Sequence, residues 1–206
     1  LAHARDRPDA DALVFRGEDK VRRRLSWREL EALVSRLAQA FRAEGIVAGD
    51  RIAAMMPNMP ETIAAMLAAT SIGAVWSSCS PDFGERGVLD RFGQIEPKLL
   101  IACDGYYYAG KTIEIADKLA AIAGKLGAAK TIVVPYLGKA EEVAATTPGG
   151  VSLDTFIAPY APREIAYERL PFSHPLYILF SSGTTGVPKC IVHCAGGLLV
   201  HLLALL

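Results

Sequence analysis

The sequence predicts an α/β protein with a mostly parallel sheet flanked by helices. Short apolar segments alternate along the chain with longer segments whose apolar residues recur at helical spacing. Strands of a parallel sheet are covered on both faces, so they read as continuous apolar runs. Strands that feed helices in this order are expected to connect by right-handed crossovers. With 206 residues and 51% hydrophobic composition, the chain can bury a substantial core.

The first predicted helix begins at a capping box. Ser26 is its N-cap, Glu29 reaches back to the N-cap, and apolar residues follow at helical spacing as far as Phe41. Gly45 ends this run. Further helices are predicted over residues 61–71, 84–94 and 112–126. We expect Asp82 and Glu85 to cap the helix that begins near Gly84.

The predicted strands are short apolar segments between turn residues. They cover residues 51–56, 74–76, 99–103, 131–134 and 176–180. Residues 139–168 contain Thr-Thr-Pro-Gly-Gly and further prolines, and we interpret them as a surface excursion with at most a short strand or helix at 153–157. Arg22-Arg-Arg24 is interpreted as a solvated turn, and Tyr106-Tyr-Tyr108 as an exposed loop.

Composition narrows the classes of partner. Lys plus Arg equals Asp plus Glu, so no global charge attracts nucleic acid or an acidic membrane. Four cysteines in a chain of this length indicate reduced thiols and a cytoplasmic protein, and Cys79 and Cys103 are expected to be buried and inert. The apolar segment 197–206 is too short to span a membrane and predicts a buried helix. The chain starts without Met and stops inside this apolar run, so we expect a piece truncated at both ends.

The segment that carries chemistry follows the last predicted strand. An apolar run leads directly into Ser-Ser-Gly-Thr-Thr-Gly-Val-Pro-Lys, whose hydroxyls and glycine-exposed N–H groups can form a nest for a polyphosphate. The spacing differs from the Walker motif, in which Ser or Thr follows the lysine. A surface turn rich in Ser, Thr and Gly is the alternative. The predicted phosphate-binding residues are Ser181, Ser182, Gly183, Thr184, Thr185, Gly186 and Lys189.

Residues 180–189 closely resemble the phosphate loop of adenylate-forming enzymes, which include acyl-CoA synthetases, peptide-synthetase adenylation domains and luciferases. Residues 26–30 and 49–58 are similar to early motifs of the same family. The resemblance covers nearly the whole chain. It implies that residues 1–206 are part of the large N-terminal domain of the adenylate-forming fold, without the C-terminal lid. It also implies that the acyl pocket, the adenine and ribose contacts and the catalytic lysine lie beyond residue 206.

A narrower resemblance, to acetoacetyl-CoA synthetases, rests on residues 73–84, 90–98 and 104–111. It implies an ATP-dependent ligase that converts acetoacetate through acetoacetyl-AMP to acetoacetyl-CoA and releases AMP and pyrophosphate. The implied substrates and cofactors are ATP, CoA, acetoacetate and Mg²⁺, with Lys189 and Thr184 as catalytic residues. The related acetyl-CoA synthetases contact CoA at positions that correspond here to Trp76, Ser77, Ser78 and Lys111. There the first three positions read Phe-Gly-Gly, and an arginine stands where this chain has Tyr108.

Other interpretations stay open at the level of sequence. The protein could be a synthetase for acetate, propionate or another small acid, or a non-catalytic nucleotide-binding module. Trp76 could be a core aromatic at the end of a strand. Finally, Cys190, His193, Cys194 and His201 could form a zinc site, although their spacing is not a standard zinc pattern.

Overall fold

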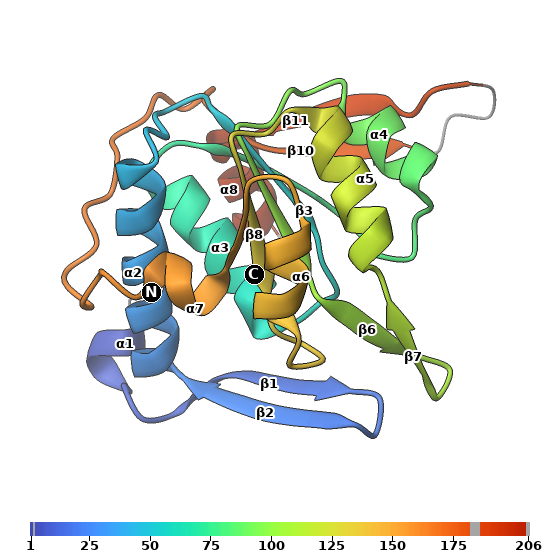
Figure 1. Ribbon diagram of the computed structural model, residues 1–206. Helices are drawn as coiled ribbons and strands as arrows, with labels where there is room; N and C mark the ends of the chain where they lie inside the picture. The colour runs from blue at the N-terminus through green and yellow to red at the C-terminus, as the bar shows by residue number, and fades with distance from the viewer. Residues whose placement is uncertain (2, 182–185, 205–206) are drawn as a thin grey trace.

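The computed structural model describes residues 1, 3–181 and 186–204, and it has the predicted mixed α/β architecture (Figure 1). Within these residues a seven-stranded sheet forms the centre of the molecule, and two separate two-stranded hairpins lie outside it. The strand order of the sheet is β11-β10-β4-β3-β5-β8-β9. The sheet strands are β3 (Arg51–Met55), β4 (Val75–Cys79), β5 (Leu99–Cys103), β8 (Lys130–Val134), β9 (Gly150–Ser152), β10 (Pro175–Ser181) and β11 (Lys189–Cys194).

All neighbouring pairs in this sheet are parallel except β10 with β11. From β3 the chain moves outward to β4 and then returns across β3 to β5, β8 and β9. Because parallel crossovers are right-handed, this reversal puts the β3–β4 helix on one face of the sheet and the later helices on the other. The five strands from β4 to β9 thus have the doubly wound order in which ligands bind at the point of reversal, beyond the carboxyl ends of the strands.

Two groups of helices cover the faces of the sheet. Helices α2, α3 and α7 lie together on one side, and α4, α5 and α6 lie on the other (Figure 1). The helices are α1 (His3–Asp6), α2 (Trp27–Ala43), α3 (Pro60–Ser71), α4 (Glu85–Phe92), α5 (Ala116–Leu126), α6 (Ala140–Thr146), α7 (Leu153–Ile157) and α8 (Ala195–Leu203).

The capping box predicted for α2 is confirmed. The Glu29 amide N–H donates to Ser26 Oγ over 3.2 Å, and the Ser26 amide N–H donates to Glu29 Oε2 over 2.7 Å. The Glu29 carboxylate accepts hydrogen bonds from both the amide and the hydroxyl of Ser26, and these lower the pKa of Glu29 because they stabilise its charged form. The helix ends at Ala43, and Gly45 takes a φ of 76°. Both ends of α2 are therefore set by local sequence.

Two hairpins replace predicted turns and part of a predicted helix. Arg22–Arg24 lie in strand β2 (Val21–Ser26), paired with β1 (Asp11–Gly17), so their interpretation as a turn was wrong. Tyr106–Tyr108 lie in β6 (Gly105–Tyr108), paired with β7 (Lys111–Glu114), rather than in a loop. The helix predicted over 112–126 consequently begins only at Ala116. The β6–β7 turn makes residues 111–114 extended, because pairing with β6 satisfies their backbone groups.

Two further expectations were also wrong. Residues 139–168 contain the predicted helix α7, but also helix α6 and strand β9, and β9 extends the main sheet beside β8. Gly84 is the N-cap of α4 and receives no side-chain hydrogen bond. Asp82 instead accepts a hydrogen bond from Ser80, and Glu85 pairs with Lys125. Lys125, 40 positions further along the chain, thus pairs with the Glu85 carboxylate that local sequence predicted as a helix cap.

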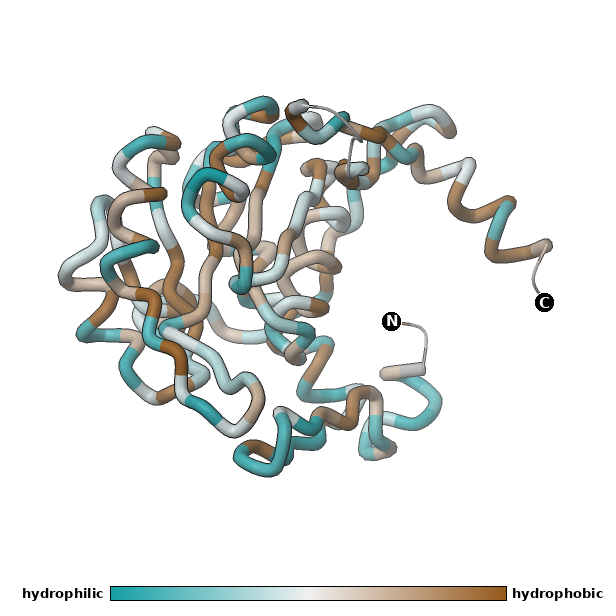
Figure 2. The backbone as a smooth tube through the Cα atoms, turned by 90° about the vertical axis from the view of Figure 1, so that its right-hand side faces the viewer, coloured by the Kyte–Doolittle hydropathy of each residue, from teal (hydrophilic) through white to brown (hydrophobic). Residues whose placement is uncertain are grey.

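The apolar segment near the end of the described chain does form a helix, α8, but its side chains are exposed rather than buried. Leu199, Val200, Leu202 and Leu203 are each more than half exposed. Figure 2 shows this hydrophobic helix extending away from the body of the molecule. The described residues cover only part of its surface, which accounts for the difference.

Candidate functional site

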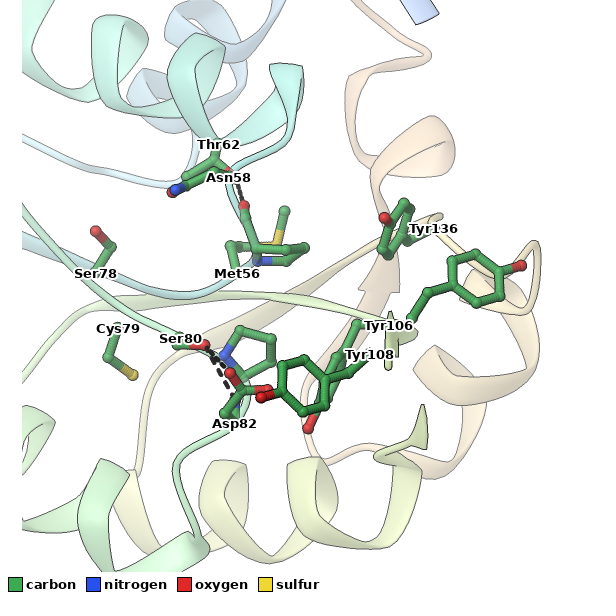
Figure 3. Close-up of a pocket in the computed structure, with 13 residues that line it drawn as sticks. Met56, Asn58, Thr62, Ser78, Cys79, Ser80, Asp82, Tyr106, Tyr108 and Tyr136 are labelled. Atoms are coloured by element: carbon green, nitrogen blue, oxygen red, sulfur yellow. Dashed lines mark hydrogen bonds between the residues drawn. The ribbon is translucent and has the colours of Figure 1, made fainter. Parts of the chain in front are cut away.

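A cavity of about 410 Å³ opens at the carboxyl edge of the central strands (Figure 3). Thr62 of α3 and four parts of the chain that follow or end these strands line it. The four parts are residues 56–58 after β3, residues 78–82 at the end of β4, residues 106–108 of β6, and Tyr136 after β8. The cavity therefore lies beside the reversal of strand order, where doubly wound sheets bind ligands.

One wall of the cavity carries a polar network. Ser80 Oγ donates to Asp82 Oδ2 over 3.0 Å, and the Asp82 amide N–H donates back to Ser80 Oγ. Burial raises the pKa of Tyr106 to about 12, with a further contribution from its hydrogen bond to Asp82. Tyr106 is consequently a neutral phenol over the physiological pH range. Its O–H donates to Asp82, and its ring lines the cavity.

Lys118 holds this wall from the first turn of α5. Its ammonium group donates to the carbonyl oxygen of Pro81 over 2.6 Å and to that of Phe83 over 3.3 Å. Burial lowers the pKa of Lys118. Sequence reasoning missed this residue, because the loop it fixes lies more than 30 positions earlier in the chain.

Asp104 fixes the opposite wall and was also missed. Its carboxylate is buried and accepts three backbone N–H groups, from Tyr136 and Leu137 over 2.8 Å and from Lys139 over 2.6 Å. Three donors satisfy most of the hydrogen-bonding capacity that burial would otherwise leave empty. The position of an Asp directly after an apolar strand is the sequence signal that could have drawn attention to it.

The predicted phosphate loop begins at the same edge of the sheet. Strand β10 runs parallel to β4, with Tyr177 opposite Trp76 and Ile178 opposite Ser77. Strand β11 returns antiparallel, and this pairing puts Lys189 directly opposite Ser181. Both predicted residues therefore lie at the base of the loop. Ser182, Gly183, Thr184 and Thr185 lie outside the described residues.

The loop exit is braced by a residue that the sequence did not indicate. Gln94, just after α4, donates from Nε2 to the carbonyl oxygen of Pro188 over 2.8 Å. The Cys190 thiol donates to Gln94 Oε1 over 3.6 Å. Gly186, just before these contacts in the chain, has a φ of 111°, which side-chain-bearing residues rarely adopt. The described part of the loop has the glycine geometry that the sequence predicted for Gly186.

The residues predicted to contact CoA fall into two groups. Trp76 is 4% exposed and belongs to the hydrophobic core, and Ser77 is 1% exposed and donates to the carbonyl oxygen of Ile178. Ser78 is half-buried and lines the cavity, while Lys111 is exposed on β7, opposite Tyr108. Two of the four positions are thus accessible at or beside the cavity, and their role in binding CoA stays a prediction.

The cysteines and the membrane expectation can be assessed directly. Cys103 is buried as predicted, whereas Cys79 is only half-buried and lines the cavity. Burial raises the pKa of each thiol to about 12, which disfavours the reactive thiolate. Among the described residues, no cluster of three or more His, Cys, Asp or Glu side chains could hold a metal ion, which leaves the zinc alternative without support there. None of the helices in the described part of the chain is both long and apolar enough to cross a membrane.

Comparison with protein families decides the affiliation of the chain. Residues 2–205 match the family described as "AMP-binding enzyme". The chain belongs to this family. Its relatives include the acetoacetyl-coenzyme A synthetase of Rhizobium meliloti (strain 1021), 68% identical over 193 residues, a match that covers 93% of this chain and 30% of the relative. The acetoacetyl-CoA synthetase of Macaca fascicularis is 46% identical over 184 residues, covering 86% of this chain and 27% of that protein.

A solved structure of this AMP-binding family agrees with the fold. Acetoacetyl-CoA synthetase from Streptomyces lividans superposes with a TM-score of 0.88 at 42% sequence identity, over 97% of this chain and 30% of that one. The adenylate-forming fold and the resemblance to acetoacetyl-CoA synthetases that the sequence predicted are confirmed. The chain spans about 30% of the length of the curated relatives it matches.

Proposed function

We propose that the whole protein is an ATP-dependent acid–thiol ligase that converts acetoacetate through acetoacetyl-AMP to acetoacetyl-CoA and releases AMP and pyrophosphate. The observation that carries this proposal is the high sequence identity to acetoacetyl-CoA synthetases along almost the whole chain. The shared part includes the strand–loop–strand unit in which Ser181 stands opposite Lys189. In this proposal residues 1–206 are part of the large N-terminal domain, and the lid belongs to the remainder of the whole protein.

The first half-reaction is an attack of the acid's carboxylate on the α-phosphate of ATP, with pyrophosphate as the leaving group. Such an in-line displacement depends on positioning and on neutralisation of charge. We assign the β- and γ-phosphates to the loop over 181–186 and Lys189. The ammonium group of Lys189 and the hydroxyl of Thr184 would stabilise the negative charge that develops on the departing pyrophosphate.

Mg²⁺ would enter this site together with ATP. The cation prefers oxygen ligands, retains several waters, and is often held by substrate phosphates rather than by a cage of protein side chains. The described residues fit that mode, because they offer hydroxyl and backbone groups around the base of the loop and no cluster of carboxylates. When bound, Mg²⁺ supplies charge neutralisation across the phosphate oxygens.

The second half-reaction, attack of the CoA thiolate on acetoacetyl-AMP, needs a separate place for CoA. We propose that the cavity at the carboxyl edge receives it, with Ser78 in the wall and Lys111, exposed opposite the cavity-lining Tyr108, to meet a phosphate. Tyrosines 106–108 offer aromatic faces for an adenine ring or for pantetheine. Trp76 and Ser77 would hold β4 beneath this segment. Free thiols on all four cysteines suit a cytoplasmic location for the protein.

Acid-dependent exchange of pyrophosphate into ATP tests the proposal. The whole protein is assayed with acetoacetate, acetate, propionate and butyrate, beside a Lys189→Ala variant and a matched Lys20→Ala control from an exposed turn. We expect the fastest exchange with acetoacetate, a loss of about 10²–10³-fold in Lys189→Ala, and no change in Lys20→Ala. Faster exchange with another acid would refute the substrate but retain the reaction. A folded protein that binds ATP without exchange would be a nucleotide-binding module instead.

A further inference from the structure

The turns of the two hairpins meet through one carboxylate. Glu18, in the β1–β2 turn, accepts the backbone N–H of Ala109 on Oε1 and that of Gly110 on Oε2, each over 2.8 Å. Ala109 and Gly110 form the β6–β7 turn, and Figure 1 shows the two hairpins extending to the same side of the molecule. Both oxygens of an ionised group are thus used to hold adjacent amides, the stronger kind of hydrogen bond.

The β6–β7 turn has a backbone that benefits from such external support. Ala109 has a φ of 49° and Gly110 a φ of 75°, both in the left-handed region typical of two-residue hairpin turns. Glycine or asparagine is favoured at the first of these positions, because a Cβ there is crowded by the following carbonyl. Glu18 itself has a φ of 50°. A glycine at this position would avoid the strain, but it would lack the carboxylate that holds the two amides.

A second contact joins the β1–β2 hairpin to the wall of the cavity. A Cβ on Gly17 would lie only 2.0 Å from the hydroxyl oxygen of Tyr136, so the absence of a side chain allows Tyr136 to approach the strand. The Tyr136 ring lies 6.0 Å from that of Phe15 and meets Tyr107 edge-on, with centroids 5.4 Å apart. The β1–β2 hairpin therefore packs against the aromatic wall of the cavity and also binds the β6–β7 turn beside it.

We propose that Glu18 is a positioning residue for the CoA half-reaction. By holding the amides of Ala109 and Gly110, it fixes the turn that joins Tyr108 to Lys111, and so fixes both side chains relative to the cavity. This inference rests on the proposed function, because it assigns CoA to that cavity. The predicted phosphate loop joins β10 to β11 at one lateral edge of the sheet. The aromatic wall that the hairpin contacts follows β8, toward the opposite lateral edge. Loss of the Glu18 contacts therefore affects CoA binding and leaves adenylation in place.

The test compares three variants of the whole protein in both half-reactions. Glu18→Ala removes both acceptors, Glu18→Gln retains one oxygen, and Asp19→Ala changes the neighbouring exposed carboxylate, which pairs with Arg16. We expect Glu18→Ala to raise the KM for CoA about tenfold, as the loss of charge-assisted hydrogen bonds implies. Glu18→Gln should give a smaller increase. Acetoacetate-dependent pyrophosphate exchange should be unchanged in all three variants, and Asp19→Ala should leave the KM for CoA unchanged.

Hydrogen exchange measures the contact itself without reference to catalysis. In Glu18→Gln, the amides of Ala109 and Gly110 should exchange faster than in Asp19→Ala, which also covers the case in which Glu18→Ala does not fold. An unchanged KM for CoA, equal losses in both half-reactions, or equal amide exchange in these two variants would each overturn the inference. Absence of acid-dependent exchange in the unmutated protein would instead overturn the proposed function, and this inference with it.

Discussion

Strands β5 and β10 have similarly apolar sequences and belong to one sheet, but they have different surroundings. All five residues of β5 are buried. In β10 only Ile178 is buried, and Leu179 is 46% exposed. β5 lies between β3 and β8 with helices over both faces, whereas β10 lies between β4 and the edge strand β11. An apolar run therefore predicts that a strand forms, but the elements packed around it decide how much stability it contributes.

Thiol chemistry offers the largest contrast between the two regions. Cys103 ends β5 and is fully buried with a pKa raised to about 12 by that burial, whereas Cys190 is exposed on β11. Modification of Cys103 requires opening of the central sheet, so Cys190 should react about 10³-fold faster with a disulfide reagent at pH 8. Stopped-flow labelling of the 206-residue chain, with Cys103→Ser and Cys190→Ser variants to assign each phase, measures the ratio. Similar rates for the two thiols would remove the distinction between the regions.

Two matched Leu-to-Ala substitutions test whether the two strands differ in how much their packing stabilises the protein. Leu100 in β5 is 0% exposed, and Leu179 in β10 is nearly half exposed. Leu100→Ala should lower the free energy of unfolding by about 3 kcal/mol, because it removes buried methyl groups and leaves a cavity. Leu179→Ala should lower it by less than about 1 kcal/mol. Urea unfolding of both variants decides the matter, and equal losses would contradict the difference in cover.

The central region also depends on a buried polar group directly after β5. Replacing Asp104 by Asn keeps the shape but exchanges one acceptor oxygen for an amide donor that faces a backbone N–H. We expect a loss of about 2 kcal/mol in the free energy of unfolding. Asp19→Asn, at an exposed turn, should change it by less than about 0.5 kcal/mol. A silent Asp104→Asn substitution in urea unfolding would show that the three hydrogen bonds are dispensable.

The smallest effect is expected at the opposite end of the central strands. Burial alone would raise the pKa of Asp50, but the hydrogen bond from Lys98, the Val47 amide and the charges of Lys98 and Arg51 together lower it. A lowered pKa in the folded state stabilises the protein above the unfolded-state value, near 3.8, and this contribution is lost as pH falls through the folded-state pKa.

Asp50→Asn should therefore reduce stability at neutral pH and make the loss of stability below about pH 4 shallower. Urea unfolding at a series of pH values from 7 to 3 measures the profile, with Asp19→Asn as the control. A variant profile parallel to that of the unmodified chain would remove Asp50 from the account of acid sensitivity.

Local sequence predicted the elements whose ends are marked by nearby residues. The helix that follows Ser26 and the strand over 99–103 formed as expected, because a capping box and a continuous apolar run are local signals. The β6–β7 hairpin was missed, because its turn uses Ala109-Gly110 rather than the Asn-Gly or Asp-Gly typical of such turns. Strand β9 was missed, because its three residues begin at the last glycine of a Pro-Gly-Gly segment and gain their structure from pairing with β8.

The candidate site divides in the same way. The predicted phosphate loop is a run of consecutive residues, so the position of its base at Ser181 and Lys189 could be anticipated from sequence. Lys118 and Gln94 could not, and Asp104 was signalled only by its place directly after an apolar strand, since each acts on a backbone group that is tens of residues distant in the chain. The sequence left Trp76 open between a CoA contact and a core aromatic, because β10, whose pairing covers one side of it, arrives a hundred positions later; its burial favours the core alternative.

The order of strands in the sheet has a consequence for the order in which the protein folds. The partner of Ile101 in β8 is Ile132, and β9 follows soon after, so the central strands can pair while synthesis is still under way. The hydrogen bond from Ser77 to Ile178 joins residues 101 positions apart, and contacts between residues so distant in the chain form slowly. The strand that carries the phosphate loop is therefore added to a sheet already assembled. The predicted phosphate loop is thus the last part of this unit to form.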